Sequence, residues 1–65
     1  MRLAASDSFA FYNRGLAYGE LGQHEEAIED FSEAIRLAPT DADAFYYRGY
    51  NYSKLEQYEE AIEDY

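Results

Sequence analysis

Apolar residues recur every three or four positions along most of this chain, which is the spacing of a helical face. Between residues 25 and 38 they form one stripe, and acidic residues occupy the opposite side of the same segment. The stripe consists of Ala27, Ile28, Phe31, Ala34, Ile35 and Ala38. This pattern predicts an amphipathic helix that buries one face.

The segment from about residue 8 to 21 also has helical spacing, but it is apolar on two sides. One side carries Phe11, Arg14, Gly15, Tyr18 and Leu21, and the other carries Phe9, Tyr12, Leu16 and Gly19. A helix of this kind contacts neighbours on both faces, or a neighbour on one and a ligand on the other.

Turn residues separate the predicted helices. Gly22 follows the first helix and suits a left-handed C-terminal cap. Pro39 ends the second helix, and Thr40 or Asp41 can cap a third. The chain therefore reads as a series of helices with short connections.

The sequence matches itself at an offset of 34 residues. Residues 10–12 return as 44–46, and the acidic run at 25–30 returns as 59–64. Glu56 replaces Gly22 in the second copy, so we expect the second turn to be either strained or differently shaped. Each copy is predicted to be one pair of helices.

These matches define the expected organisation of the chain. We expect residues 1–7 to hold the tail of a preceding repeat's second helix and a linker, residues 8–41 to be a complete repeat, and residues 42–65 to be a second repeat with a truncated second helix. Because both ends fall inside repeats, we expect the chain to be part of a longer array.

The repeat resembles the tetratricopeptide repeat in its period and its spaced residues. The matching residues are Phe11, Arg14, Gly15, Tyr18, Ala27, Phe31, Ala34 and Pro39, then Phe45, Arg48, Gly49, Tyr52, Ala61 and Tyr65. The resemblance implies an all-α fold of antiparallel helix-turn-helix repeats stacked as a right-handed superhelix. It further implies a protein–protein interaction scaffold without enzymatic activity, whose first helices line a concave groove for a peptide or helix.

Arg14 and Arg48 stand where the family usually has leucine. A charged head must leave the core, so we expect the side-chain stems to pack while each guanidinium reaches an acid on a second helix. Glu29 and Asp30 are the candidate partners of Arg14.

The groove of such a superhelix would be lined by equivalent positions of the two first helices. The candidate partner-binding residues are Phe9, Tyr12, Leu16, Glu20, Asp43, Tyr46, Tyr50 and Lys54. Tyrosines suit recognition because each has a rigid apolar ring and a polar tip. Gly19 and Ser53 would leave room for a ligand backbone. The alternative is that the rings of Tyr12, Tyr46, Tyr47 and Tyr50 only pack between repeats.

Charge and composition narrow the partners. A formal net charge of −9 disfavours nucleic acid and anionic membranes, and favours a protein or peptide ligand with basic flanks. The acidic clusters diverge on straight helical faces, and His24 lies at a turn where packing is expected, so neither predicts a metal, cofactor or catalytic site. The chain has no cysteine, and no signal peptide or membrane span is evident, which fits a cytoplasmic protein.

A second functional class is self-assembly. A repeat array needs a polar cap at its end, and residues 59–65 form only a short apolar-faced helix. We expect Ala61, Ile62 and Tyr65 to leave an open edge, through which copies stack or exchange helices.

Overall fold

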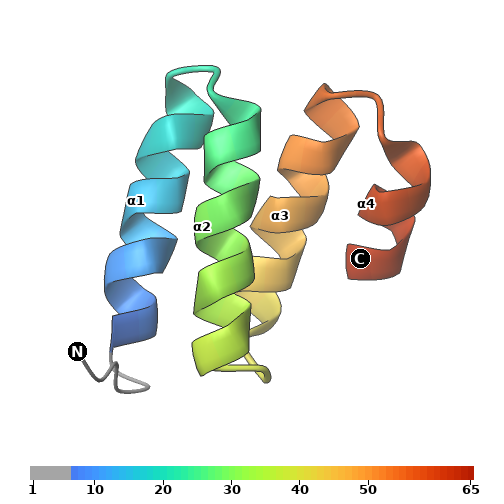
Figure 1. Cartoon of the computed structure of the whole chain (residues 1–65). Coiled ribbons are helices and arrows are strands. Elements are labelled where there is room, and N and C mark those ends of the chain that lie inside the picture. The colour runs from blue at the N-terminus through green and yellow to red at the C-terminus, as the bar shows by residue number, and fades with distance from the viewer. Residues whose placement is uncertain (1–6) are drawn as a thin grey trace.

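The computed structural model describes residues 7–65, which form four helices arranged in a row (Figure 1). These are α1 (Ser8–Glu20), α2 (His24–Leu37), α3 (Ala42–Lys54) and α4 (Tyr58–Asp64). No strand occurs within that range. The predicted all-α fold, with two helix pairs of which the second has a short second helix, is confirmed. The expected helix tail at residues 1–6 lies outside the described residues.

The turn from α1 to α2 is a helix C-terminal motif with two backbone hydrogen bonds. The Gln23 N–H donates to the Tyr18 carbonyl over 2.9 Å, and the Gly22 N–H donates to the Gly19 carbonyl over 3.1 Å. This pairing is the Schellman motif, which needs one residue in the left-handed region. Gly22 occupies that position with φ of 79°.

The turn from α3 to α4 repeats this motif without a glycine. The Gln57 N–H donates to the Tyr52 carbonyl over 2.9 Å, and the Glu56 N–H donates to the Ser53 carbonyl over 3.0 Å. Glu56 takes φ of 62° in the left-handed position. The second turn therefore keeps the shape of the first, and of the two expectations from sequence the strained one is correct.

We expect Glu56→Gly to stabilise the fold by about 0.5–1 kcal/mol. The left-handed conformation costs an L-residue roughly 1–2 kcal/mol, and the larger backbone entropy of an unfolded glycine offsets part of the gain. Urea unfolding followed by circular dichroism measures the change. The matched control is Gly22→Ala, which should lose about 1 kcal/mol for the same reason. A lower midpoint for Glu56→Gly would contradict the strain assigned to this turn.

Asp41 lies in the connection between the two repeats and caps the N-terminus of α3. Its Oδ1 accepts hydrogen bonds from the backbone N–H of Asp43 over 3.1 Å and of Ala44 over 3.3 Å. A carboxylate at the N-terminus of a helix accepts hydrogen bonds from backbone amides that have no partner within the helix. Its negative charge also interacts favourably with the positive end of the helix dipole. Of the two caps that the sequence allowed, Asp41 is therefore the one used.

The core lies where α1, α2 and α3 meet. Its fully buried residues are Ala27, Phe31, Ala34 and Ala44. The Phe31 ring is stacked on Tyr47 with centroids 6.1 Å apart, and it meets the Tyr12 ring edge-on at 5.8 Å. Gly15 gives this ring its space, because a Cβ there would lie 3.1 Å from two of its atoms and 3.2 Å from a third.

Each repeat pairs the arginine of its first helix with an aspartate of its second. The Arg14 guanidinium donates two hydrogen bonds to the buried carboxylate of Asp30, at 2.7 and 2.9 Å. Arg48 makes the same bidentate pair with Asp64, with both bonds at 2.8 Å. Asp30, rather than Glu29, is thus the partner that the sequence left open.

Aromatic rings flank both guanidinium groups. Arg14 lies 5.8 Å from the Phe11 ring and 5.9 Å from the Tyr18 ring, and Arg48 has the equivalent pair in Phe45 and Tyr52. A planar cation over ring faces gains electrostatic attraction while its stem covers apolar surface. This arrangement accommodates an arginine at a helix-pairing position.

The apolar edge at α4 differs from the sequence prediction, because Ala61 is buried and Tyr58 is exposed. Ala61 was expected to lie open, but it is 2% exposed because α4 approaches α3 closely at Gly49. The large apolar residues exposed at this edge are Tyr58 and Ile62 of α4 and Tyr65, which directly follows α4. Ala61 therefore holds the second helix pair together and is not available at the edge.

Candidate functional site

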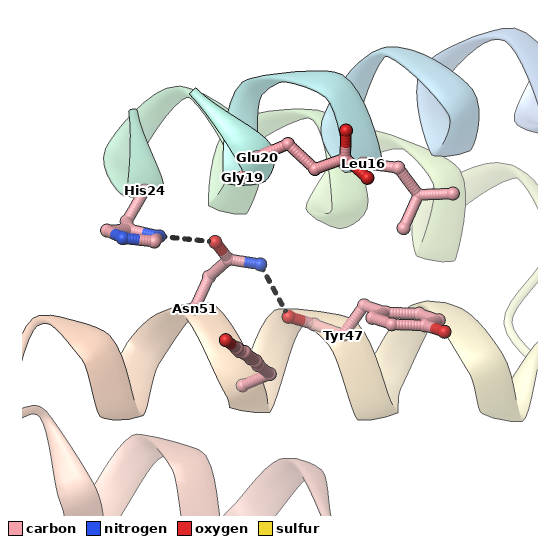
Figure 2. A pocket seen from close by; sticks show the side chains of 7 residues that line it. Leu16, Gly19, Glu20, His24, Tyr47 and Asn51 are labelled. Atoms are coloured by element: carbon pink, nitrogen blue, oxygen red, sulfur yellow. Dashed lines mark hydrogen bonds between the residues drawn. The ribbon is translucent and has the colours of Figure 1, made fainter. Parts of the chain in front are cut away.

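A hollow of about 330 Å³ lies between the C-terminal half of α1, the first residue of α2, and α3 (Figure 2). Its lining residues are Leu16, Gly19, Glu20, His24, Tyr47, Tyr50 and Asn51. Both first helices of the two repeats contribute to it. The hollow is therefore a product of repeat stacking and does not belong to one helix pair.

The apolar wall of the hollow combines an aliphatic side chain with two rings. Leu16 and Tyr47 are half-buried and pack on the core. Tyr50 is more exposed, and the Lys54 ammonium lies 5.2 Å from its ring centroid. A side chain entering the hollow would contact apolar surface on both helices.

The polar side of the hollow is built on Asn51, which is only 5% exposed. Its Nδ2 donates to the Tyr47 carbonyl over 2.7 Å, which leaves the amide oxygen as an acceptor. That oxygen lies 2.7 Å from His24 Nδ1, so the imidazole carries its proton on Nδ1 (Figure 2). This chain of hydrogen bonds ties α2 to α3 and satisfies the buried amide.

Gly19 is the point at which α1 allows Asn51 to approach. A Cβ at position 19 would lie 3.1 Å from Asn51 Oδ1. The space beside this glycine is therefore occupied by a side chain of the next repeat. Gly19 also lines the hollow, so the interpretation that it leaves room for a ligand backbone stays a prediction.

Glu20 supplies the carboxylate of the hollow, and this carboxylate makes no ion pair or hydrogen bond with residues 7–65. Its side chain extends from α1 beside Leu16 (Figure 2). An exposed carboxylate next to an apolar wall is suited to the head of a cationic side chain whose stem packs on the wall.

The structure brings together three of the eight residues predicted for the groove. Leu16, Glu20 and Tyr50 line the hollow. Lys54 is linked to it through the Tyr50 ring. Phe9 and Asp43 are exposed in the N-terminal halves of α1 and α3, away from the lining residues.

Two predicted tyrosines have different surroundings. The Tyr12 ring packs between the repeats against Phe31 and Tyr47, which is the packing role that the sequence left as the alternative. The pKa of Tyr12 is raised, chiefly because burial disfavours the phenolate and also because Tyr47, Asp43 and Asp41 repel it. Tyr46 is exposed and contacts the Tyr47 and Tyr65 rings.

Sequence reasoning missed Asn51 and gave His24 only a packing role. A signal for Asn51 existed, since it follows Ala44 and Tyr47 at helical spacing on the buried face of α3. A polar residue on such a face needs a buried hydrogen-bond partner. The identity of that partner, His24, depends on how the repeats stack.

Two further kinds of site are absent from residues 7–65. No group of three or more histidine, aspartate or glutamate side chains in this part of the chain could hold a metal ion. None of its helices has the length and apolar character needed to cross a membrane.

Comparison with known proteins identifies the repeat. A family model described as tetratricopeptide repeat matches residues 8–41, and a second model with the same description matches residues 31–63. No curated protein matches the chain. The general role of these repeats is protein–protein interaction. The matches cover most of the chain, and together with the two stacked helix pairs they show that it belongs to the tetratricopeptide repeat family.

Proposed function

We propose that the hollow between α1 and α3 binds a side chain of an extended peptide or of a partner's helix. The observation that carries the proposal is the lining itself, in which Leu16 and Tyr50 face a common space beside the Glu20 carboxylate. Concave apolar sites with a few placed polar groups are the usual form of ligand pockets.

The preferred side chain in this hollow is lysine or arginine. Glu20 is the carboxylate among the lining residues, and the chain as a whole carries a formal charge of −9. The Lys54 ammonium lies over the Tyr50 ring, which keeps one basic group at the margin. This excess of negative charge favours a partner that has basic residues on either side of the side chain bound in the hollow.

Only micromolar affinity is expected from a hollow of this size. Specific interfaces with high affinity bury far more surface than seven residues provide, and association also costs translational and side-chain freedom. The electrostatic share of the binding should weaken as salt screens exposed charges.

A peptide-library selection followed by titration of the selected peptides tests this function. We expect Tyr50→Ala and Glu20→Gln each to weaken binding about tenfold, the equivalent of roughly 1.4 kcal/mol, because each removes one part of the site. The matched control is Glu29→Gln, an exposed acid on α2 that does not line the hollow. Loss of binding in the control alone would place the functional surface on the acidic outer face.

Tyr12→Ala is unsuitable as a test of this site. Its ring contacts both Phe31 and Tyr47, so its removal would damage the core and lower binding indirectly. Tyr50 and Glu20 are partly or largely exposed, and their substitution should leave the melting curve nearly unchanged.

We propose self-association as a second function, on a different observation. Tyr58 and Ile62 of α4, and Tyr65 directly after it, expose 59, 71 and 65% of their surface. An exposed apolar group of this kind is typical of an interaction surface. Sedimentation over a concentration series distinguishes this function from ligand capture by a monomer.

A further inference from the structure

The face of α2 that α3 covers has an exposed equivalent on α4. His24 hydrogen-bonds Asn51 of α3, and Phe31 is stacked on Tyr47 of α3 and is fully buried. Ile28 lies between these two residues on the same helical stripe. The equivalents at an offset of 34 residues are Tyr58, Ile62 and Tyr65, all of which are exposed. The α4 helix thus presents an uncovered copy of an interface that the chain builds internally.

The opposite end of the helix row carries the matching face. α3 meets α2 and the core through Ala44, Tyr47 and Asn51. The equivalent residues of α1 are Ala10, Asn13 and Ala17, and all three are exposed. α1 and α4 lie at the two ends of the row (Figure 1). One chain therefore holds both halves of its own inter-repeat interface, on opposite sides.

The side-chain sizes on the two free faces compensate each other. On the α4 side, Ser53 replaces Gly19 and Tyr58 replaces His24, so that face has larger side chains than the equivalent face of the first repeat. On the α1 side, Ala17 replaces Asn51 and Asn13 replaces Tyr47, so that face has smaller ones. Within the chain Gly19 makes room for Asn51, whereas between copies Ala17 would make room for Ser53 and Tyr58.

We propose that the exposed face of α4 docks on the outer face of α1 of a second copy, head to tail, in the register that α3 adopts on α2. This inference rests on the second function proposed above. The contact joins two different surfaces, so each added copy leaves one free face at each end and the assembly stays open-ended. α4 has seven residues where α2 has 14, so the contact is shorter than the internal one and forms only at high concentration.

Charge acts against this contact at low ionic strength. Each copy carries a formal charge of −9, and the exposed acids Glu59, Glu60 and Glu63 lie on the same helix as Ile62. Salt screens such repulsion, so association should strengthen as salt is added. Binding of a basic peptide in the hollow should respond in the opposite direction, which separates the two functions in one titration.

Sedimentation velocity on the whole chain, up to several hundred micromolar and at low and high salt, provides the test. We expect the weight-average mass to rise above the 7.5 kDa of one chain with both protein and salt concentration. Ala17→Arg blocks one face and Ile62→Arg blocks the other, and each should lower the association constant about tenfold or more. Both positions are exposed, so circular dichroism of each variant should match the parent.

Mixing the two variants tests whether the α4 face of one copy pairs with the α1 face of another, head to tail. Each variant keeps one intact face, so an equimolar mixture should form a dimer that does not grow further with concentration. A parent chain that stays monomeric throughout would overturn both this inference and the self-association function. Association that Ile62→Arg abolishes and Ala17→Arg leaves intact would keep self-association but replace head-to-tail docking with a symmetric or helix-exchanged dimer.

Discussion

Phe31→Ala is expected to unfold most of the chain at 25 °C. The Phe31 ring is fully buried among α1, α2 and α3, where it contacts the Tyr12 and Tyr47 rings. Removing a buried phenylalanine costs about 3–5 kcal/mol, through lost burial and the cavity that remains. A single core below about 70 residues rarely supplies more than 3–5 kcal/mol in total. Loss of the helical circular dichroism signal, and its partial return in a stabilising osmolyte, measure the effect.

The chain provides its own control for this variant. Tyr65 occupies the equivalent position in the second repeat, but it is 65% exposed and its ring contact is with Tyr46. We expect Tyr65→Ala to cost no more than about 1 kcal/mol, because little apolar area leaves the core. Equal losses in the two variants would mean that Phe31 is not the centre of the packing.

Gly15→Leu should have the second-largest effect, a destabilisation of about 3 kcal/mol at the upper end of the range for overpacked cores. A Cβ at position 15 would lie 3.1 Å from two atoms of the Phe31 ring and 3.2 Å from a third, so a larger side chain would press against the ring. The ring cannot move freely, since Tyr12 and Tyr47 hold it. Urea denaturation compares the variant with the parent.

Gly15→Ala and Glu29→Gln are controls that separate overpacking from other causes of destabilisation. In Gly15→Ala the tight contact opposes a gain in helix propensity of about 1 kcal/mol, so the net change should be small. Glu29 is exposed on α2, and its neutralisation should stay within about 0.5 kcal/mol. If Gly15→Leu unfolded at the same urea concentration as these two variants, the close approach of α1 and α2 would be contradicted.

The contrast between Phe31 and Tyr65 also bears on function. Two residues related by the repeat have the same local helix but different surroundings, since α3 covers one and solvent covers the other. Stability is therefore concentrated at the α1–α2–α3 junction, which also forms the hollow. The α4 edge contributes less to the core and has its apolar residues available for contact.

Much of the fold could be predicted from the sequence because it depends on local and periodic signals. The 34-residue offset and the 3.6-residue spacing predicted the four helices, and Gly22, Asp41 and Pro39 marked their ends. The sequence also predicted that each arginine reaches an acid on a second helix, because a charged head must leave the core, but the choice of aspartate came from the structure. Leu16 and Glu20 were predicted to share a surface because they lie four residues apart on one helix.

The division of the aromatic residues between core and surface could not be predicted from the sequence. Tyr12, Tyr46 and Tyr50 have the same side chain and similar positions on equivalent helices. Tyr12 and Tyr46 each contact the ring of the second helix in their own repeat, Phe31 and Tyr65 respectively. Tyr12 is more buried because α3 places Tyr47 against it, whereas Tyr46 and Tyr50 lie on α3 itself and stay exposed. Which ring is covered is therefore decided by how one helix pair packs on the other.

By itself, then, the sequence determined the helices, their pairing and the residues suited to the turns between them. Each of these depends on residues that are close together in the sequence. The tertiary structure decided that Glu56 keeps the shape of the glycine turn, that His24 meets Asn51, and that Tyr58, Ile62 and Tyr65 form one exposed face. The physical reason is that these features depend on how helices pack within and between the repeats, and helical periodicity does not specify how deeply or at what angle two helices meet.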